Sequence, residues 1–334
     1  MDLVVSLDTE ADDQWRHGTP LSCGNVEYWQ AFQALCEAHD ILPTYLLTSE
    51  MAENRRAAAA LGQWVVDGRA EAGAHLHSWT TPPFVDAAGL RFNDALHVFE
   101  RSLPDDLLRA KLETLTRQIA EGVGVRPLCY RAGRFGIGQS SARILAELGY
   151  VADSSVTPLV SWRDESLRSA QGEGPDFRRH SAAPFVIAGS GQPGLLELPV
   201  TVILTSRWVR RHPAFTQAYL SRPARGVSWL LHRGRSHPEP TWLRPFPHQN
   251  VGDLKRVWWA AQQEGLPTAV MMFHSSELMP GASPYRPTRR SVTGLLATLD
   301  EFFRFVVRAG GTPVTMSRGA RRVLAAGTPE RRAL

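Results

Sequence analysis

The chain begins Met1-Asp-Leu-Val-Val-Ser-Leu-Asp8-Thr9-Glu10, and this stretch decides the fold. Leu3 to Leu7 is apolar, rich in β-branched residues and too short for a helix, so it predicts a buried strand. The acidic residues start where this run ends. Because side chains two apart on a strand point to the same side, Asp8 and Glu10 can face one point just beyond the strand. Two carboxylates around one point indicate a cation between them, a metal ion or an arginine, unless both are ordinary loop residues or helix caps.

The composition is that of a folded globular protein. The 334 residues are 43% hydrophobic and 21% charged, which is enough for one barrel-sized domain or two smaller ones. A formal net charge of +4 permits an anionic ligand but does not require one. The three cysteines, Cys23, Cys36 and Cys129, are odd in number and widely spaced, which argues against a disulfide framework and favours a reducing compartment.

Signals for secretion and for membrane insertion are not visible. The sequence shows no positively charged n-region, and a predicted strand begins almost at Met1. No run of about 18 apolar residues occurs, so we expect no membrane span. The sequence therefore predicts a cytoplasmic protein, and nothing in it resembles a nucleic-acid-binding module.

Predicted strands and helices alternate along the chain. The strands cover residues 3–7, 41–47, 70–76, 127–130, 150–152, 195–204, 268–273 and 312–314, and the helices cover 25–39, 50–67, a stretch after Pro104, 140–148, 251–265 and 292–308. This alternation predicts an α/β fold, a distorted (β/α)7–8 barrel with a parallel sheet inside and helices outside. An open doubly wound sheet is the alternative, but no G-x-G-x-x-G follows the first strand. We expect a single domain over residues 1–318 and a basic tail, 319–334, that frays.

Polar residues gather where the predicted strands end. The first strand ends in Asp8 and Glu10, the third in His75 and His77, and three later strands in Arg131, Asp153 and His274. In a parallel barrel the C-terminal strand ends share one face, so these seven side chains are expected to converge on one mouth.

The two histidines lie two apart at a strand end, so both rings can point the same way. Together with a carboxylate such as Glu10, His75 and His77 can form a three-ligand site for Zn²⁺ or a similar divalent ion, with one position open for water. The alternative is that both histidines pack under the loop that starts at Trp79.

Arg131 and His274 offer further chemistry at the same mouth. An arginine beside a carboxylate holds it ionised and oriented. A histidine presented by a strand can act as a general acid near neutral pH. The simpler interpretations are a surface arginine and a satisfied core histidine.

The order of these motifs resembles the polysaccharide deacetylases, the NodB-homology group of carbohydrate esterase family 4. Ser6–Glu10 resembles the family's Thr-Phe-Asp-Asp-Gly motif, Ala74–Ser78 its histidine motif, Arg131–Gly136 its Arg-x-Pro-Tyr motif and Met271–His274 its closing Leu-x-Leu-His. Divergent members tied to lipopolysaccharide and exopolysaccharide biosynthesis share Leu-Asp-Thr-Glu near the start and Phe-His-Ser-Ser-Glu-Leu-x-Pro-Gly near the end, as here at 273–281.

The chain departs from the family pattern in three places. The family's adjacent Asp-Asp is here Asp8-Thr9-Glu10, its two histidines are normally four apart, whereas here position 79 is Trp, and its proline after the arginine is missing. Either Asp8 or Glu10 can therefore be the third metal ligand.

The resemblance implies hydrolysis of an N-acyl group on an amino sugar. A divalent metal, with Zn²⁺ the expected ion, would be held by Glu10, His75 and His77. Asp8, oriented by Arg131, would take a proton from the attacking water, and His274 would protonate the departing amine. The resemblance further implies that Asp153 orients His274 or the sugar.

Three further residues are expected to contact the substrate: Trp15, Trp79 and Arg134. A run of arginines from Arg207 to Arg235 can face the phosphate of a nucleotide- or lipid-linked sugar, or can form a solvated basic face. Two other functions remain open. The barrel can bind a glycan or a glycosyltransferase partner without catalysis, or it can hydrolyse a non-sugar amide.

Overall fold

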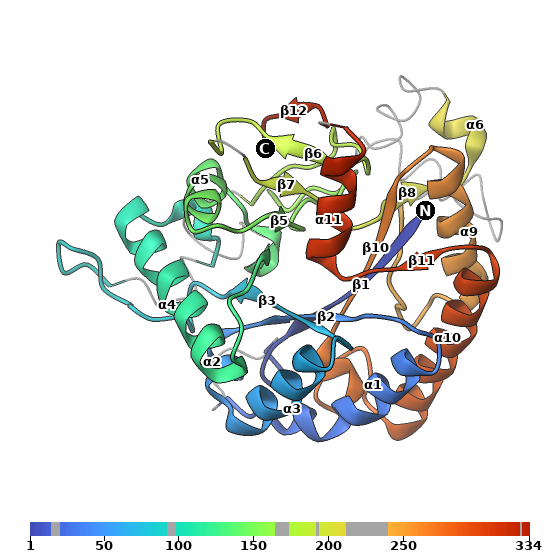
Figure 1. Cartoon of the computed structure of the whole chain (residues 1–334), viewed down its shortest axis with the longest axis horizontal. Coiled ribbons are helices and arrows are strands. Elements are labelled where there is room, and N and C mark those ends of the chain that lie inside the picture. Colours follow the sequence, from blue (N-terminus) through green and yellow to red (C-terminus); the bar gives the residue numbers. More distant parts are fainter. Residues whose placement is uncertain (15–20, 92–97, 164–173, 192–193, 212–239, 328) are drawn as a thin grey trace.

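A curled, mostly parallel sheet forms the centre of the molecule (Figure 1). The computed structural model describes residues 1–14, 21–91, 98–163, 174–191, 194–211, 240–327 and 329–334. Seven strands follow one another in the order β10-β1-β2-β3-β4-β5-β7, each parallel to its neighbours. Their bounds are β1 Asp2–Thr9, β2 Thr44–Leu47, β3 Glu71–Leu76, β4 Cys129–Ala132, β5 Ala152–Asp153, β7 Leu196–Glu197 and β10 Thr268–His274. The short strand β11 (Thr312–Pro313) also pairs with the start of β1.

The chain after β7 brings the sheet back towards β10. The amide of Leu198 donates to the carbonyl of Asp153, and the amide of Thr201 donates to the carbonyl of Val270 at 3.0 Å. The predicted strand 195–204 is therefore two strands, β7 and β8 (Val202–Leu204), because Pro199 between them lacks an amide proton. Strand β8 pairs antiparallel with β9 (Pro240–Trp242). The curled sheet with its outer helices confirms the predicted distorted barrel.

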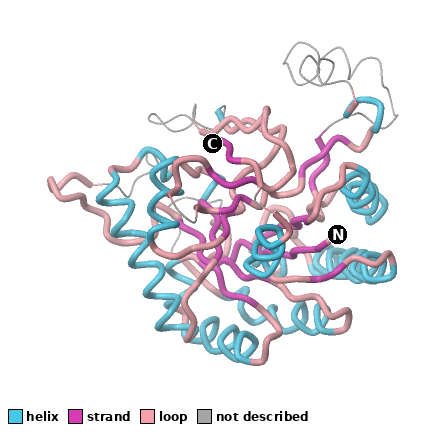
Figure 2. Tube along the Cα trace, turned by 45° about the horizontal axis from the view of Figure 1, so that its top comes forward, coloured by secondary structure: helices cyan, strands magenta, loops and turns pink. Residues whose placement is uncertain are grey.

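Helices surround this sheet, as Figure 2 shows from another side. They are α1 Trp29–Glu37, α2 Ser49–Glu53, α3 Arg55–Val66, α4 Asp105–Val123, α5 Gln139–Glu147, α6 Arg207–Arg210, α9 Val251–Gln263, α10 Arg289–Arg308 and α11 Met316–Ala325, with 3-10 turns η1 Gly24–Tyr28, η2 Glu100–Ser102, η3 Gly133–Phe135 and η5 Ser275–Leu278. The predicted helix 50–67 is broken at Asn54, whose side chain caps α3 by accepting from the amides of Arg56 and Ala57. No described helix is long and apolar enough to cross a membrane.

The two faces of β1 contact different parts of the protein. Leu3, Val5 and Leu7 pack in the large core that includes the outer helices. Val4 packs in a smaller apolar cluster, and the other members of its face are Ser6 and Asp8. The guanidinium of Arg131, on β4, donates to both Ser6 and Asp8 although β2 and β3 lie between β1 and β4. These side chains therefore meet inside the barrel.

The C-terminal segment closes the end of the barrel where the strands begin. On α11, Met316, Ala320 and Val323 recur at helical spacing and pack in the same small cluster as Val4. The expected fraying of the tail is wrong, because this apolar stripe is buried while the helix's arginines stay exposed. Strand β12 (Arg331–Arg332) extends the sheet beyond β7 by pairing with β6 (Phe185–Ile187), and β6 in turn is antiparallel to β7. The single-domain organisation stays a prediction.

Candidate metal and catalytic site

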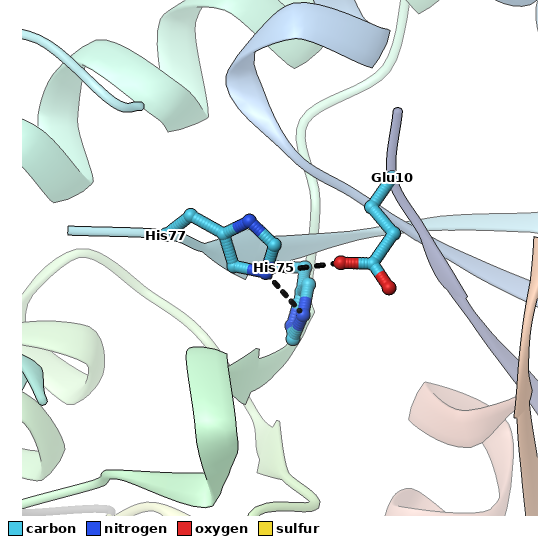
Figure 3. Close-up of side chains that lie close together, drawn as sticks. All are labelled: Glu10, His75 and His77. Carbon is cyan, nitrogen blue, oxygen red and sulfur yellow. Dashed lines mark hydrogen bonds and ion pairs between the residues drawn. The ribbon is translucent and has the colours of Figure 1, made fainter. Parts of the chain in front are cut away.

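Glu10, His75 and His77 point towards one another at the C-terminal ends of β1 and β3 (Figure 3). The Nε2 atom of His77 lies 3.2 Å from Nε2 of His75 and 3.3 Å from a carboxylate oxygen of Glu10. All three side chains are buried, and one ligand atom from each lies within 4.8 Å of the others. The convergence that the sequence predicted for these three residues is present in the structure.

The donor set suits a divalent metal. Two ligand atoms about 2.1 Å from a tetrahedral ion lie roughly 3.4 Å apart, close to the separations seen here. Burial lowers the pKa of both histidines, which keeps the rings neutral and able to ligate. Burial also raises the pKa of Glu10, and the nearby Asp8 and Glu50 carboxylates add to this rise. A cation bound among these groups would offset the unfavourable free energy of burying the ionised Glu10 carboxylate beside other carboxylates.

A hydrogen bond orients the ring of His75. Its Nδ1 atom lies 2.9 Å from the carbonyl oxygen of Arg131, the residue opposite it in the β3–β4 pairing. Because a carbonyl only accepts, Nδ1 carries the proton and Nε2 is left with a free lone pair facing Glu10 and His77. The backbone of β4 thus selects the tautomer that a metal ligand needs.

Asp8 is held mainly by Arg131. A nitrogen of the Arg131 guanidinium donates to Asp8 at 2.6 Å, and Arg131 is fully buried. The same guanidinium also donates to the hydroxyls of Ser6 and Ser154. Burial by itself would raise the pKa of Asp8, but the positive charge of Arg131 and the hydrogen bond that it donates lower this pKa below its ordinary value. Asp8 is thus ionised and oriented, whereas Glu10 faces the histidines.

His274 completes the mouth from β10. The pairing of β1 with β10 sets it opposite Asp8, and its Nε2 atom lies 3.4 Å from Glu10 and 4.0 Å from Asp8. On the other side of the ring, Nδ1 lies 3.0 Å from Arg244 and 3.5 Å from Glu277. The ring is partly exposed, with 16% of the side chain accessible, so Nε2 can face a substrate.

The sequence prediction missed the charges behind His274. Arg244 and Glu277 form a buried ion pair at 2.9 Å, and Arg286 lies 3.7 Å from the second carboxylate oxygen of Glu277. Burial alone would raise the pKa of Glu277, but the positive charges of Arg244 and Arg286 lower it. Glu277 belongs to the quoted 273–281 motif, so its spacing of three from His274 was a usable signal. Arg244 lies between the predicted strand 195–204 and the predicted helix 251–265, where the sequence predicted no element and no pattern singled it out.

Asp153 lies at the same end of the barrel but contacts a different set of residues. Its carboxylate accepts from the hydroxyl of Ser155 at 2.6 Å and from the amide of the same residue. It pairs with Glu197 on β7, and burial raises the pKa of both carboxyl groups. The Nδ1 atom of His274 contacts Arg244 and Glu277, whereas Asp153 contacts Ser155 and pairs with Glu197. A role for Asp153 in orienting His274 or the sugar stays a prediction.

The expected substrate-contacting residues fall partly within the described chain. The ring of Trp79 stacks on that of His77, with centroids 4.3 Å apart, and the guanidinium of Arg134 lies 5.6 Å from the centroid of Trp79. Trp15 lies outside the described residues. Of the predicted basic run, Arg210 pairs with Glu264 at 2.7 Å, which gives it a structural partner, while the arginines from 222 to 235 also lie outside the described residues.

Comparisons with solved structures agree with the motif resemblance. A Mycobacterium smegmatis protein assigned as a polysaccharide deacetylase superposes with a TM-score of 0.58 at 18% identity, over 99% of this chain and 93% of that one. More distant matches are a Clostridium thermocellum family 4 acetyl xylan esterase with a bound cobalt ion (TM-score 0.45, 10% identity, 98% and 93% covered) and a CE4-family pseudoenzyme from Bacillus anthracis (0.43, 12%, 96% and 65%). No protein-family model and no curated protein matches the sequence. The fold is that of the polysaccharide deacetylases.

Proposed function

We propose that the protein is a metal-dependent hydrolase that removes an N-acyl group, such as acetyl, from an amino sugar of a polysaccharide or lipopolysaccharide precursor. One observation carries this proposal: the Glu10–His75–His77 cluster shares a mouth with the Asp8–Arg131 pair and with His274. This arrangement would bring the ligands, base and acid for amide hydrolysis together in one site. The solved deacetylase with the same fold supports a glycan substrate.

Glu10, His75 and His77 would hold the ion, with Zn²⁺ the expected one. When bound, a divalent metal polarises the acyl carbonyl and lowers the pKa of a water molecule. The geometry favours Glu10 over Asp8 as the third ligand, because Glu10 lies 3.3 Å from His77 while Asp8 is engaged by Arg131.

The remaining residues would handle protons. Asp8, kept ionised by Arg131, would accept the proton of the attacking water. In this structure Nδ1 of His274 accepts from Arg244, which can only donate, at 3.0 Å. A protonated His274 would exchange this hydrogen bond for one from Nδ1–H to Glu277, 3.5 Å away, and would donate from Nε2 to the departing amine. Trp79 and Arg134 would contact the sugar beside His77.

The experiment pairs metal content with amine release. Purified protein is supplied with Zn²⁺ and assayed for free amine on N-acetylglucosamine, its short oligomers and a UDP-linked N-acetyl amino sugar, beside His77→Ala and Glu10→Ala. We expect close to one metal ion per chain, lost in both variants, together with a fall in kcat/KM of at least ~10³-fold. His39→Ala, which removes a histidine paired with Asp300 away from the mouth, is the matched control.

Two results would contradict the proposal. Wild-type protein that takes up no metal and releases no amine would favour a glycan- or partner-binding barrel. Turnover of simple amides without turnover of any acylated amino sugar would support a hydrolase but contradict an amino-sugar substrate.

We also infer a nucleotide- or lipid-linked precursor in the cytoplasm as the substrate. The three cysteines are unpaired, which suits a reducing compartment. Fractionation of cells that produce the protein, followed by assay of each fraction, tests the location.

A further inference from the structure

A row of polar side chains crosses three neighbouring strands on one face of the sheet: Tyr130 on β4, Asp153 on β5 and Glu197 on β7. The strand pairing sets Tyr130 opposite Asp153, and Asp153 opposite Glu197. All three side chains are fully buried. We call Asp153 and Glu197 the acid pair. Two neighbouring carboxyl groups in a buried site cannot both be charged at low cost unless a cation lies between them.

The hydrogen bonds of the two carboxyl groups differ. Both oxygens of Asp153 accept from Ser155, one from its hydroxyl at 2.6 Å and the other from its amide at 3.1 Å. In Glu197, one oxygen accepts from the amide of Val156 at 3.0 Å, whereas the other finds no donor among the described residues. A buried oxygen without a donor is costly in a carboxylate, but a protonated carboxyl group can itself donate. Asp153 therefore fits the ionised form, and Glu197 fits the protonated form.

The charges around the acid pair also favour a single shared proton. Burial raises the pKa of both members, and the charge of one raises the pKa of the other. Arg131 opposes this rise, but its guanidinium is already bound to Asp8 at 2.6 Å. Two further titratable neighbours, Glu100 and Tyr130, are hydrogen-bonded to each other and bring no positive charge. One proton between the two carboxyl groups removes their repulsion.

The acid pair supports the chain segment that follows β5, and this segment supports Arg131. The carbonyl and the hydroxyl of Ser154 both accept from the Arg131 guanidinium, at 2.8 and 3.0 Å. The hydroxyl of Ser155, which donates to the acid pair, also accepts from the amide of Ala132 at 2.8 Å. Arg131 in turn donates to Asp8, the proposed base. The acid pair is thus connected to the base through hydrogen bonds that are all buried.

We propose that Glu197 is a positioning residue, which carries the one proton of the acid pair and so keeps Arg131 aligned on Asp8. With this proton in place, the ionised member of the pair can accept twice from the segment after β5, while Glu197 holds the amide of Val156. A charged Glu197 would repel its partner and weaken this support. The effect on catalysis rests on the proposed function, whereas the protonation of Glu197 does not.

Infrared spectroscopy tests the proton directly. A protonated carboxyl group has a carbonyl stretch that is separate from the bands of a carboxylate and that shifts in heavy water. Near neutral pH we expect wild-type protein to show such a band that Glu197→Gln lacks. Glu100→Gln is the matched control: burial raises the pKa of Glu100 to about 8, so this variant should lose a different band and keep that of Glu197. Identical spectra of Glu197→Gln and wild type in this region would overturn the assignment.

Two conservative substitutions test the asymmetry of the pair. Glu197→Gln keeps a carbonyl for Val156 and sets an N–H donor against Asp153, so its urea midpoint should stay near the wild-type value. Asp153→Asn sets an N–H group against one of the donors of Ser155, so its midpoint should fall below that of Glu197→Gln. The reverse order would place the proton on Asp153 and overturn the proposal.

Kinetics test the positioning role. Glu197→Met leaves the amide of Val156 and the carboxylate of Asp153 without their partner, and kcat for amine release should fall by up to ~10²-fold as Arg131 shifts. KM and metal content should stay near the wild-type values, and Glu197→Gln should restore kcat. Ser155→Ala, which removes the hydroxyl shared with Ala132, should lower kcat in the same way and serves if Glu197→Met does not fold. An unchanged kcat in these variants overturns the positioning role.

A stability measurement separates this inference from the proposed function. If no protein releases amine, the proposed function fails, but the infrared bands and the urea midpoints still decide where the proton lies. A double-mutant cycle in urea between Ser155→Ala and Arg131→Met then decides the positioning role. Losses that do not add show that the segment after β5 and Arg131 act together, whereas additive losses overturn the positioning role.

Discussion

Two parts of the mouth are held in place differently. Strand pairing positions the part around His75 and His77, which we call the sheet-built half, whereas buried charges position the part around His274, which we call the charge-built half. His75 stands in register with Arg131 on β4 and bonds its carbonyl. His274 also stands on a strand, yet its ring contacts Arg244 and Glu277, which both lie outside the strands. Backbone hydrogen bonds tolerate many side-chain changes, but a buried ion pair fails when either partner is removed. The two halves should therefore respond differently to substitution.

The largest effect is expected from Arg131→Met, which breaks the fully buried Arg131–Asp8 ion pair. This pair lies where the two halves meet, because the carbonyl of Arg131 bonds His75 and Asp8 stands opposite His274. Asp8 would be left buried without its cation, and the loss of unfolding free energy should be about 3–5 kcal/mol. Urea denaturation measures this loss, and kcat should fall with it. The double variant Arg131→Met/Asp8→Asn, which removes both charges, should recover part of the stability. A single variant as stable as wild type would show that this pair does not hold the barrel interior together.

Glu277→Gln tests the charge-built half. It removes the negative charge between Arg244 and Arg286, and we expect a loss of about 2–4 kcal/mol. Because the proposed metal ligands lie in the other half, the bound metal should stay near the wild-type amount while kcat falls. Loss of the metal in this variant would contradict the division of the mouth into two independent halves.

Gly133→Ala should disturb the sheet-built half without changing a charge. A β-carbon there would lie 2.5 Å from the carbonyl oxygen of Leu76 and 2.9 Å from a ring carbon of His77. Moving His77 should weaken metal binding by roughly 10–100-fold, measured by competition with a chelator. Gly294→Ala on α10, where a β-carbon meets nothing within 4 Å, is the control and should gain up to ~1 kcal/mol of stability.

The smallest effect is expected from Lys111→Met. Lys111 lies on α4 and binds the loop that follows His77. Its ammonium donates to the carbonyls of Ser78 and Thr81, and burial lowers its pKa from 10.5 to about 8. Between these two pH values the unfolded chain keeps a proton that the folded chain has released, so this group makes stability rise with pH in that window. In Lys111→Met the rise should be smaller. Urea midpoints at about pH 8 and pH 10 measure it, and an unchanged slope would contradict the shifted pKa.

The same contrast explains what the sequence could predict. Positions at strand ends follow from a two-residue period, so Asp8, Glu10, His75 and His77 can be placed from the sequence alone. The partners of His274 lie outside the strands, Arg244 in a loop and Glu277 in the 3-10 turn η5, where no two-residue period fixes the direction of a side chain. The arginine content of α11 suggests a solvated tail and masks the apolar stripe of every third or fourth residue that buries the helix. Pro199 does carry a sequence signal for the break between β7 and β8, because proline cannot donate to a strand ladder.

The pairing of β1 with β10 also determines when, during synthesis and folding, the site can form. Asp8 and His274 face each other across neighbouring strands although they stand near opposite ends of the chain. During synthesis the proposed metal ligands leave the ribosome early, but strand β10, which carries His274, follows only when most of the chain has been made. Contacts between such distant residues form slowly, because a long loop must close first. Activity regained during refolding should therefore lag behind secondary structure and report the late closing of the barrel.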